Sequence, residues 1–146
     1  MILNITNSFL ACDPGWTYFA HTRNCYKSDE STLTRSEASQ ACKAANPNAH
    51  LVSIFDKTTN DFVFSMIKIR SWIGLNKVSN EWRWEDGTKA SYTNWNQDPP
   101  QPSGDGPSVE MFKTQNFVPG LWNDIVGDHK ASGYVCQYAP NGKLLV

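Results

Sequence analysis

The sequence predicts a single α+β domain that is rich in turns. Its 146 residues suffice for one domain with a buried core. Two segments have the spacing of amphipathic helices, and short strand-like segments lie before, between and after them. A content of 6 Trp and 8 Pro with only 18% charged residues is typical of an irregular domain rather than a helical bundle.

The chain begins with an N-terminal extension, residues 1–11, ahead of a domain expected over residues 12–139 and a C-terminal tail over residues 140–146. The extension is moderately apolar, which suits either a signal-sequence remnant or a strand of the mature protein. It is not a complete signal peptide, because no charged region opens it and polar residues interrupt its apolar run. Asn4-Ile5-Thr6 matches the acceptor pattern for N-glycosylation and agrees with secretion.

The four cysteines predict two disulfide bonds among three possible pairings. Cys12 and Cys25 flank a turn and a β-prone segment, so a hairpin would bring them together, which leaves Cys42 to pair with Cys136. The second bond closes a loop of roughly 95 residues and stabilises the fold by about 4–5 kcal/mol in the chain-entropy model. No Cys-x-x-Cys pair is present, which excludes zinc and thioredoxin-like sites. The even count and the spacing favour an extracellular, oxidising compartment over free cytosolic thiols.

Two helices are expected in the first half of the chain. Thr34 and Glu37 have the spacing of a capping box, and small apolar residues then recur at helical spacing. This helix carries Cys42 on its buried face and ends at Asn46-Pro47. The second helix begins at Asp56. Its apolar residues are Phe62, Phe64, Met66, Ile67 and Ile69.

Short strands are expected around the helices, at residues 16–26, 50–54, 71–75, 80–85, 109–112 and 133–138. Turn-forming residues dominate between Tyr92 and Pro119, and such a long irregular segment in a compact domain is usually functional or disordered. Five tryptophans are expected in the core. They are Trp72, Trp82, Trp84, Trp95 and Trp122.

Composition and motifs argue against several classes of protein. The net charge is −1 and no Lys/Arg cluster occurs, so nucleic acid is not an expected partner. The sequence contains no run of about twenty apolar residues, so no transmembrane segment is expected. The three histidines, His21, His50 and His129, are isolated and no catalytic signature occurs, so the chain is predicted not to be an enzyme.

Trp122-Asn123-Asp124 is the most informative motif. It places an amide and a carboxylate directly after an aromatic anchor, in a segment rich in Gly and Pro. Oxygen donors held in a loop are what a hard cation such as calcium needs.

Together, the motifs resemble the C-type lectin-like domain. Those that carry the resemblance are Cys-x-x-Gly-Trp at 12–16, Trp-Ile-Gly-Leu at 72–75, Trp-x-Trp-x-Asp-Gly at 82–87, Asn-Trp at 94–95, Trp-Asn-Asp at 122–124 and Tyr-Val-Cys at 134–136. The resemblance covers Cys12 to Tyr138. It implies a C-type lectin-like fold with two helices, two small antiparallel sheets and a long ligand-binding loop, and it implies the same two disulfides.

The family's sugar site is built on calcium, and the resemblance implies a similar, weaker site here. Its ligands come from a triplet, a later acidic residue, and the Asn and Asp of Trp-Asn-Asp. The triplet is Gln101-Pro102-Ser103, and the later position falls on Gly106 with Asp105 adjacent. An alternative register uses Asp98-Pro99-Pro100. The expected metal ligands are Gln101, Ser103, Asp105, Asn123 and Asp124, and the expected sugar contacts are Gln101, Asp105, Asn123 and Asp124.

The chain also departs from the family, which usually has a third pair of cysteines. Ser108 and Gly127 occupy those two positions. No thiol is left unpaired, but the long loop loses a covalent tether.

Two functions are therefore weighed. The first is a secreted, weakly calcium-dependent lectin that binds a carbohydrate or glycoprotein, with Gln101 favouring galactose-type sugars by family analogy. The alternative is a calcium-independent C-type lectin-like module that recognises a protein or glycan through its long loop. The sequence feature that distinguishes the two functions is the set of oxygen atoms that residues 101–106 offer as calcium ligands.

Overall fold

The computed structural model describes residues 11–113, 118–130 and 132–140. The predictions for Asn4 and for residues 141–146 lie outside these ranges. The elements in chain order are β1 (Thr17–Phe19), β2 (Asn24–Leu33), α2 (Arg35–Ala45), β3 (His50–Leu51), α3 (Lys57–Met66), β4 (Ser71–Val78), β5 (Glu81–Arg83), β6 (Ser108–Met111), β7 (Trp122–Ile125) and β8 (Ser132–Tyr138). This α+β composition confirms the predicted fold class.

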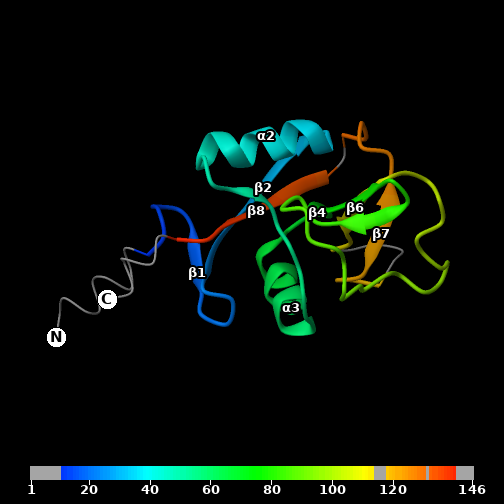
Figure 1. Cartoon of the computed structure of the whole chain (residues 1–146), viewed down its shortest axis with the longest axis horizontal. Helices are drawn as coiled ribbons and strands as arrows, with labels where there is room; N and C mark the ends of the chain where they lie inside the picture. Colours follow the sequence, from blue (N-terminus) through cyan, green and yellow to red (C-terminus); the bar gives the residue numbers. More distant parts are fainter. Residues whose placement is uncertain (1–10, 114–117, 131, 141–146) are drawn as a thin grey trace.

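The strands form one mixed sheet in the order β1-β2-β8-β4-β6-β7, with β3 paired to β8 and β5 paired to β4. The expected two antiparallel sheets are joined, because β4 and β8 run parallel through Ser71 opposite Gly133 and Trp72 opposite Tyr134. In Figure 1, α2 and α3 lie on opposite sides of this junction, and the long loop after β5 extends beside β6 and β7. Within the described ranges, neither helix is long and apolar enough to cross a membrane.

Helix α2 begins where the capping box predicts. The Thr34 hydroxyl accepts a hydrogen bond from the Glu37 backbone N–H at 3.2 Å, and the Glu37 carboxylate accepts one from the Thr34 backbone N–H at 3.0 Å. Ala38 and Cys42 are buried on the helix face that meets the sheet. The helix is therefore set by local chemistry at its start and by burial along its length.

Both predicted disulfides are present. Cys12 is bonded to Cys25, with their Cα atoms 5.6 Å apart, and Cys42 is bonded to Cys136, with their Cα atoms 5.5 Å apart. The second bond fastens α2 to β8, so the helix is covalently joined to the centre of the sheet.

Several strands differ in length from their predictions, among them β2 and β3. Strand β2 continues through residues 27–33, all but one of them polar, because its backbone pairs with β8 at residues 27–29 and again at Leu33 after a register shift. Strand β3 is only two residues long. Beyond it, the Val52 N–H donates to the Val135 carbonyl at 2.9 Å and the Ser53 N–H donates to the Gln137 side chain at 2.6 Å. Where β2 and β3 end is therefore decided by hydrogen-bond partners that are distant in sequence, and not by the pattern of apolar and polar residues.

The core is centred on aromatic rings, with two corrections to the predicted set. Trp72, Trp84 and Trp122 are buried, but Trp82 and Trp95 are only half-buried and pack against each other with ring centroids 5.0 Å apart. These two rings lie where the long loop meets the sheet. One side of each ring packs against the core, and the other side is exposed.

Trp122 lies at the centre of this aromatic group. It is 0% exposed, and its indole N–H donates to the Asn60 side chain on α3 at 2.8 Å. The rings of Trp84, Tyr92 and Trp95 meet it edge-on at 5.7–5.9 Å. Trp122 therefore joins α3, the long loop and β7.

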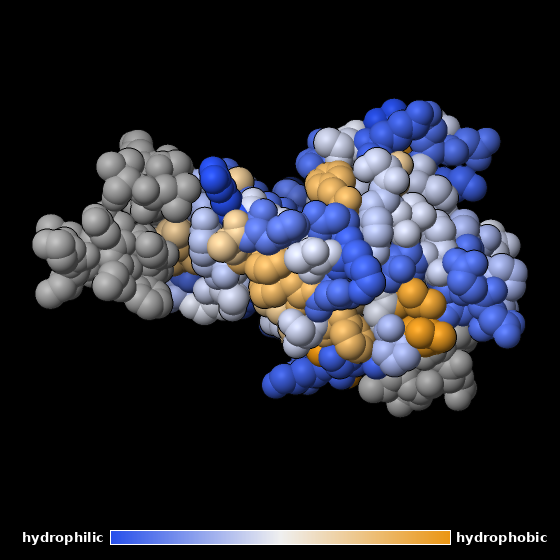
Figure 2. All heavy atoms as spheres, turned by 90° about the horizontal axis from the view of Figure 1, so that it is seen from below, coloured by the Kyte–Doolittle hydropathy of each residue, from blue (hydrophilic) through white to orange (hydrophobic). Residues whose placement is uncertain are grey.

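The face of the molecule that carries α3 also exposes apolar groups. Figure 2 shows apolar atoms gathered in the middle of this face, between polar ones. Phe19 and Phe62 stack with ring centroids 3.9 Å apart, and Phe55 is 47% exposed. The stacking joins β1 to α3 at the edge of the core.

Replacing Trp122 by Ala tests its central position. The substitution removes the central ring of the group and leaves the Asn60 side-chain oxygen without its donor, so we expect a loss of about 3–5 kcal/mol in the free energy of unfolding. Chemical denaturation followed by circular dichroism measures this. Trp82→Ala, at a half-buried position, is the control and should cost clearly less. Similar losses of stability in the two variants would contradict the central role of Trp122 in the core.

The missing third disulfide can be restored. An ideal Cβ at Gly127 would lie 3.9 Å from the Ser108 Cβ, within the range that disulfides span. We expect the variant carrying Ser108→Cys and Gly127→Cys to form this bond and to gain up to about 3 kcal/mol over its reduced form. Non-reducing peptide mapping and thermal melts measure both effects, with Ser108→Cys alone as the control. Two free thiols after mild oxidation would contradict the geometry.

Candidate functional site

Asp124 is the buried carboxylate of the predicted site, on strand β7, and is 1% exposed. Its Oδ1 accepts a hydrogen bond from the Ser103 backbone N–H at 2.7 Å, and its Oδ2 accepts one from the Gly104 backbone N–H at 2.9 Å. The Ser103 hydroxyl also donates to Oδ1, at 3.3 Å. Both oxygens therefore have donors, and the negative charge is balanced by protein dipoles as it holds the loop.

Gln101 turns toward its own segment. Its side-chain oxygen accepts a hydrogen bond from the Ser103 N–H at 3.1 Å, and its backbone N–H donates to the Asn96 carbonyl at 2.8 Å. The Asn96 side chain is buried and donates to the Pro99 carbonyl at 3.0 Å. Residues 96–104 are thus held by bonds among themselves and by Asp124.

Asn123 is hydrogen-bonded to Glu110, a residue for which the sequence predicted no role. The Asn123 side-chain N–H donates to Glu110 Oε2 at 3.2 Å. Glu110 is 0% exposed, also accepts from the Ser132 hydroxyl, and has Arg70 Nε 3.7 Å from its Oε1. A glutamate inside the apolar segment 109–112 is the signal that could have revealed this group, because a buried carboxylate requires partners.

The acidic positions of the loop contribute no second buried carboxylate. Asp105 and Asp98 are exposed and form no hydrogen bond or ion pair with the described residues. At Gly106, where the resemblance expects an acidic ligand, an ideal Cβ would lie 2.3 Å from Ile125 C and Val126 N. These are backbone atoms of the neighbouring chain segment, which cannot swing aside as a flexible side chain can, so this backbone leaves no room for a side chain at position 106.

The arrangement does not fit a calcium ion, which takes roughly six to eight oxygen ligands. Of the five predicted ligands, only Ser103 is hydrogen-bonded to Asp124, and it acts there as a donor through its N–H and O–H. The Asp105 side chain is exposed and bonds to no described residue, and the Asn123 amide donates its N–H to Glu110. Within the described ranges, no group of three or more His, Cys, Asp or Glu side chains is placed to hold a metal ion.

A hollow of about 480 Å³ lies beside Asp124. We name it the Trp82 hollow; its lining residues are Lys77, Trp82, Pro102, Ser103, Gly104, Gly106, Pro107 and Asp124. The Lys77 ammonium lies 5.7 Å from the centre of the Trp82 ring. The hollow therefore combines a flat aromatic ring, a cation and a hydroxyl, next to a carboxylate that is already hydrogen-bonded to the loop.

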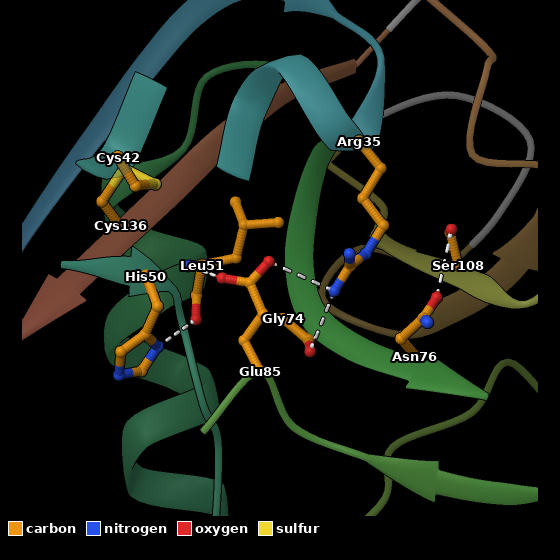
Figure 3. Close-up of polar contacts among 9 residues, drawn as sticks. All are labelled: Arg35, Cys42, His50, Leu51, Gly74, Asn76, Glu85, Ser108 and Cys136. Atoms are coloured by element: carbon orange, nitrogen blue, oxygen red, sulfur yellow. Dashed lines mark hydrogen bonds and ion pairs between the residues drawn. A yellow bond between two sulfur atoms is a disulfide. The ribbon is translucent and has the colours of Figure 1, made fainter. Parts of the chain in front are cut away.

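A largely buried ion pair fixes the β4–β5 hairpin that carries one side of this hollow (Figure 3). Arg35 Nη2 lies 3.4 Å from Glu85 Oε2, with the two side chains 15% and 13% exposed, and donates to the Gly74 carbonyl at 3.3 Å. Glu85 Oε1 accepts from the Leu51 N–H at 2.9 Å. Burial lowers the pKa of the Arg35 guanidinium, and the Glu85 carboxylate opposes that shift. The pair joins α2, β3, β4 and the end of the hairpin.

Comparison with known proteins agrees with this geometry. The sequence profile of the Lectin C-type domain matches residues 31–138. A lectin from Pleurodeles waltl is 32% identical over 137 residues, which is 87% of this chain and 76% of the relative. The cow C-type carbohydrate-recognition domain of CD23, solved in the presence of GlcNAc2Man3 oligosaccharide, is 30% identical with a TM-score of 0.75 and covers 89% of this chain and 97% of that chain.

A second solved structure, a calcium-independent type II antifreeze protein, is 25% identical with a TM-score of 0.74 over 89% of this chain and 95% of that chain. The profile match and the lectin relative each cover most of this chain. The chain therefore belongs to the C-type lectin domain family, whose members bind carbohydrate or protein and are not enzymes.

Proposed function

We propose that this chain is an extracellular lectin that binds carbohydrate without calcium. The observation that carries the proposal is the pair of hydrogen bonds from the Ser103 and Gly104 backbone N–H groups to the Asp124 carboxylate. In a calcium-built site this carboxylate would ligand the cation and the cation would order the loop. Here the loop's own N–H groups take the place of the metal.

Position 106 supports the same proposal. An acidic side chain there would supply the second strong ligand of a calcium site, but a Cβ at Gly106 would overlap the backbone of Ile125 and Val126. Calcium independence also occurs on this fold, as the antifreeze protein described above illustrates.

The Trp82 hollow is the proposed carbohydrate site. A pyranose presents an apolar C–H face and a rim of hydroxyls, which suits an aromatic ring beside polar groups. Trp82 offers its ring, Lys77 offers donors, and the Ser103 hydroxyl oxygen offers an acceptor at the same hollow. The Gln101 amide is bound within its own segment, so a preference for galactose-type sugars has no basis in this arrangement.

Extracellular location is supported by the cysteines. All four are paired in two disulfides, and disulfides persist in oxidising compartments.

Calcium provides the first test. We expect millimolar calcium to leave the melting temperature unchanged relative to chelator, because a ligand stabilises the fold only where it binds. Asp124→Asn should lower stability by about 1–3 kcal/mol equally with calcium and with chelator, since it weakens charge-assisted bonds to the loop. Differential scanning fluorimetry measures both. A calcium-dependent rise that Asp124→Asn removes would restore the calcium-built site and refute the proposal.

Immobilised glycans in the presence of chelator provide the second test. We expect binding that weakens about tenfold or more in Trp82→Ala, because loss of a central aromatic contact dominates such interfaces. Trp16→Ala is a matched control. That ring is also half-buried and has a lysine ammonium, Lys27, 6.0 Å from its centre, but it lies beside Tyr138 at the other end of the sheet. Equal losses in the two variants, or no glycan bound, would contradict the proposal.

A further inference from the structure

A second hollow, of about 420 Å³, lies between helix α2 and strands β4 and β6. We name it the Arg35 hollow; its lining residues are Arg35, Ser36, Ser39, Gln40, Lys43, Asn76, Ser108 and Gly127. Apart from the glycine, every one of these side chains is a cation, a hydroxyl or an amide, and none is a carboxylate. The wall therefore carries positive charge and offers many hydrogen-bond donors.

One wall is a polar stripe along α2. Ser36, Ser39, Gln40 and Lys43 follow one another at helical spacing and so share a face. None of these four side chains forms a hydrogen bond or ion pair with a described residue. Their donors are consequently available to a bound molecule.

Two further groups with unused donors are the Arg35 guanidinium, which also comes from α2, and the Asn76 side chain on β4. The Arg35 guanidinium lies between Glu85 and the Asn76–Ser108 pair (Figure 3), and its Nε–H is buried without a partner among the described residues. The Ser108 hydroxyl is 3.4 Å from the Asn76 side-chain oxygen, which leaves the Asn76 N–H groups without a described acceptor. Donors exceed acceptors at these two groups as well.

The hollow exists where the family's third disulfide would lie. Gly127 has no side chain and Ser108 carries a hydroxyl in place of a thiol, so the space between α2 and β6 is open and polar. Asn76 lines this hollow whereas its neighbour Lys77 lines the Trp82 hollow. Successive residues of a strand point to opposite faces, so the two hollows lie on opposite faces of β4.

We propose that the Arg35 hollow binds a tetrahedral oxyanion, the sulfate or phosphate ester of a saccharide. Such a group carries negative charge and several acceptor oxygens in a small volume. It matches a wall that has two cations, Arg35 and Lys43, and uncharged donors around them. Because Glu85 is paired with Arg35, Lys43 is the cation without a described partner, and it is the group whose charge the ester would meet.

Inorganic sulfate and inorganic phosphate are the probes, each compared with chloride at the same ionic strength. We expect the amide NMR resonances of residues 36–43, Asn76 and Ser108 to shift with at least one of the two oxyanions, and the one that binds more tightly identifies the ester. Lys43→Gln should weaken this binding about fivefold. Ser39→Leu should abolish it, because the larger side chain fills the hollow without a change of charge.

Lys68→Gln is the matched control, since it removes the same charge from an exposed lysine on another part of the surface. It should leave the affinity unchanged, and Lys43→Gln should leave chelator-resistant glycan binding at the Trp82 hollow unchanged. Identical shifts in chloride would overturn the proposal, as would equal weakening by Lys43→Gln and Lys68→Gln. Neither result would bear on the Trp82 hollow, which is tested by its own variants.

Discussion

The hydrogen bond between the Trp122 indole and Asn60 is the constraint on which the rest of the structure depends. Leaving a buried indole N–H without an acceptor is costly, and at Trp122 the acceptor comes from α3. That bond fixes the position of Trp122 on β7. The Trp122 backbone N–H donates to the Asn94 carbonyl, and the Trp122 carbonyl accepts from the Asn96 N–H, so the long loop is held against β7. Asp124, two residues further on, then reaches Ser103 without any metal.

Two buried carboxylates hold the strands near the loop, and both accept hydrogen bonds within the protein. Asp124 accepts donors from the loop, whereas Glu110 accepts from Asn123 and Ser132 with Arg70 nearby. Their oxygens already have donors in the protein. Under the proposed function, a ligand at the Trp82 hollow would meet ring surface and exposed donors, and its binding would depend little on the divalent cations in the medium.

Sequence reasoning succeeded where chemistry is local and failed where partners are distant. Thr34 and Glu37 lie three residues apart, so their capping box predicted the start of α2. The disulfides followed from a hairpin and a process of elimination. By contrast, residues 27–33 form a strand only because β8 lies beside them, and the role of Glu110 depends on three segments that meet only in the folded chain. The loop around Asp124 could not be anticipated for the same reason.

The close approach of Gly106 to β7 has an evolutionary consequence. In many sites that lose a ligand, one substitution can bring it back, and the change remains reversible. Here, replacing Gly106 by an acidic residue would first have to separate two backbones that now lie against each other. An acidic ligand at position 106 would therefore demand a remodelled loop rather than a single codon change.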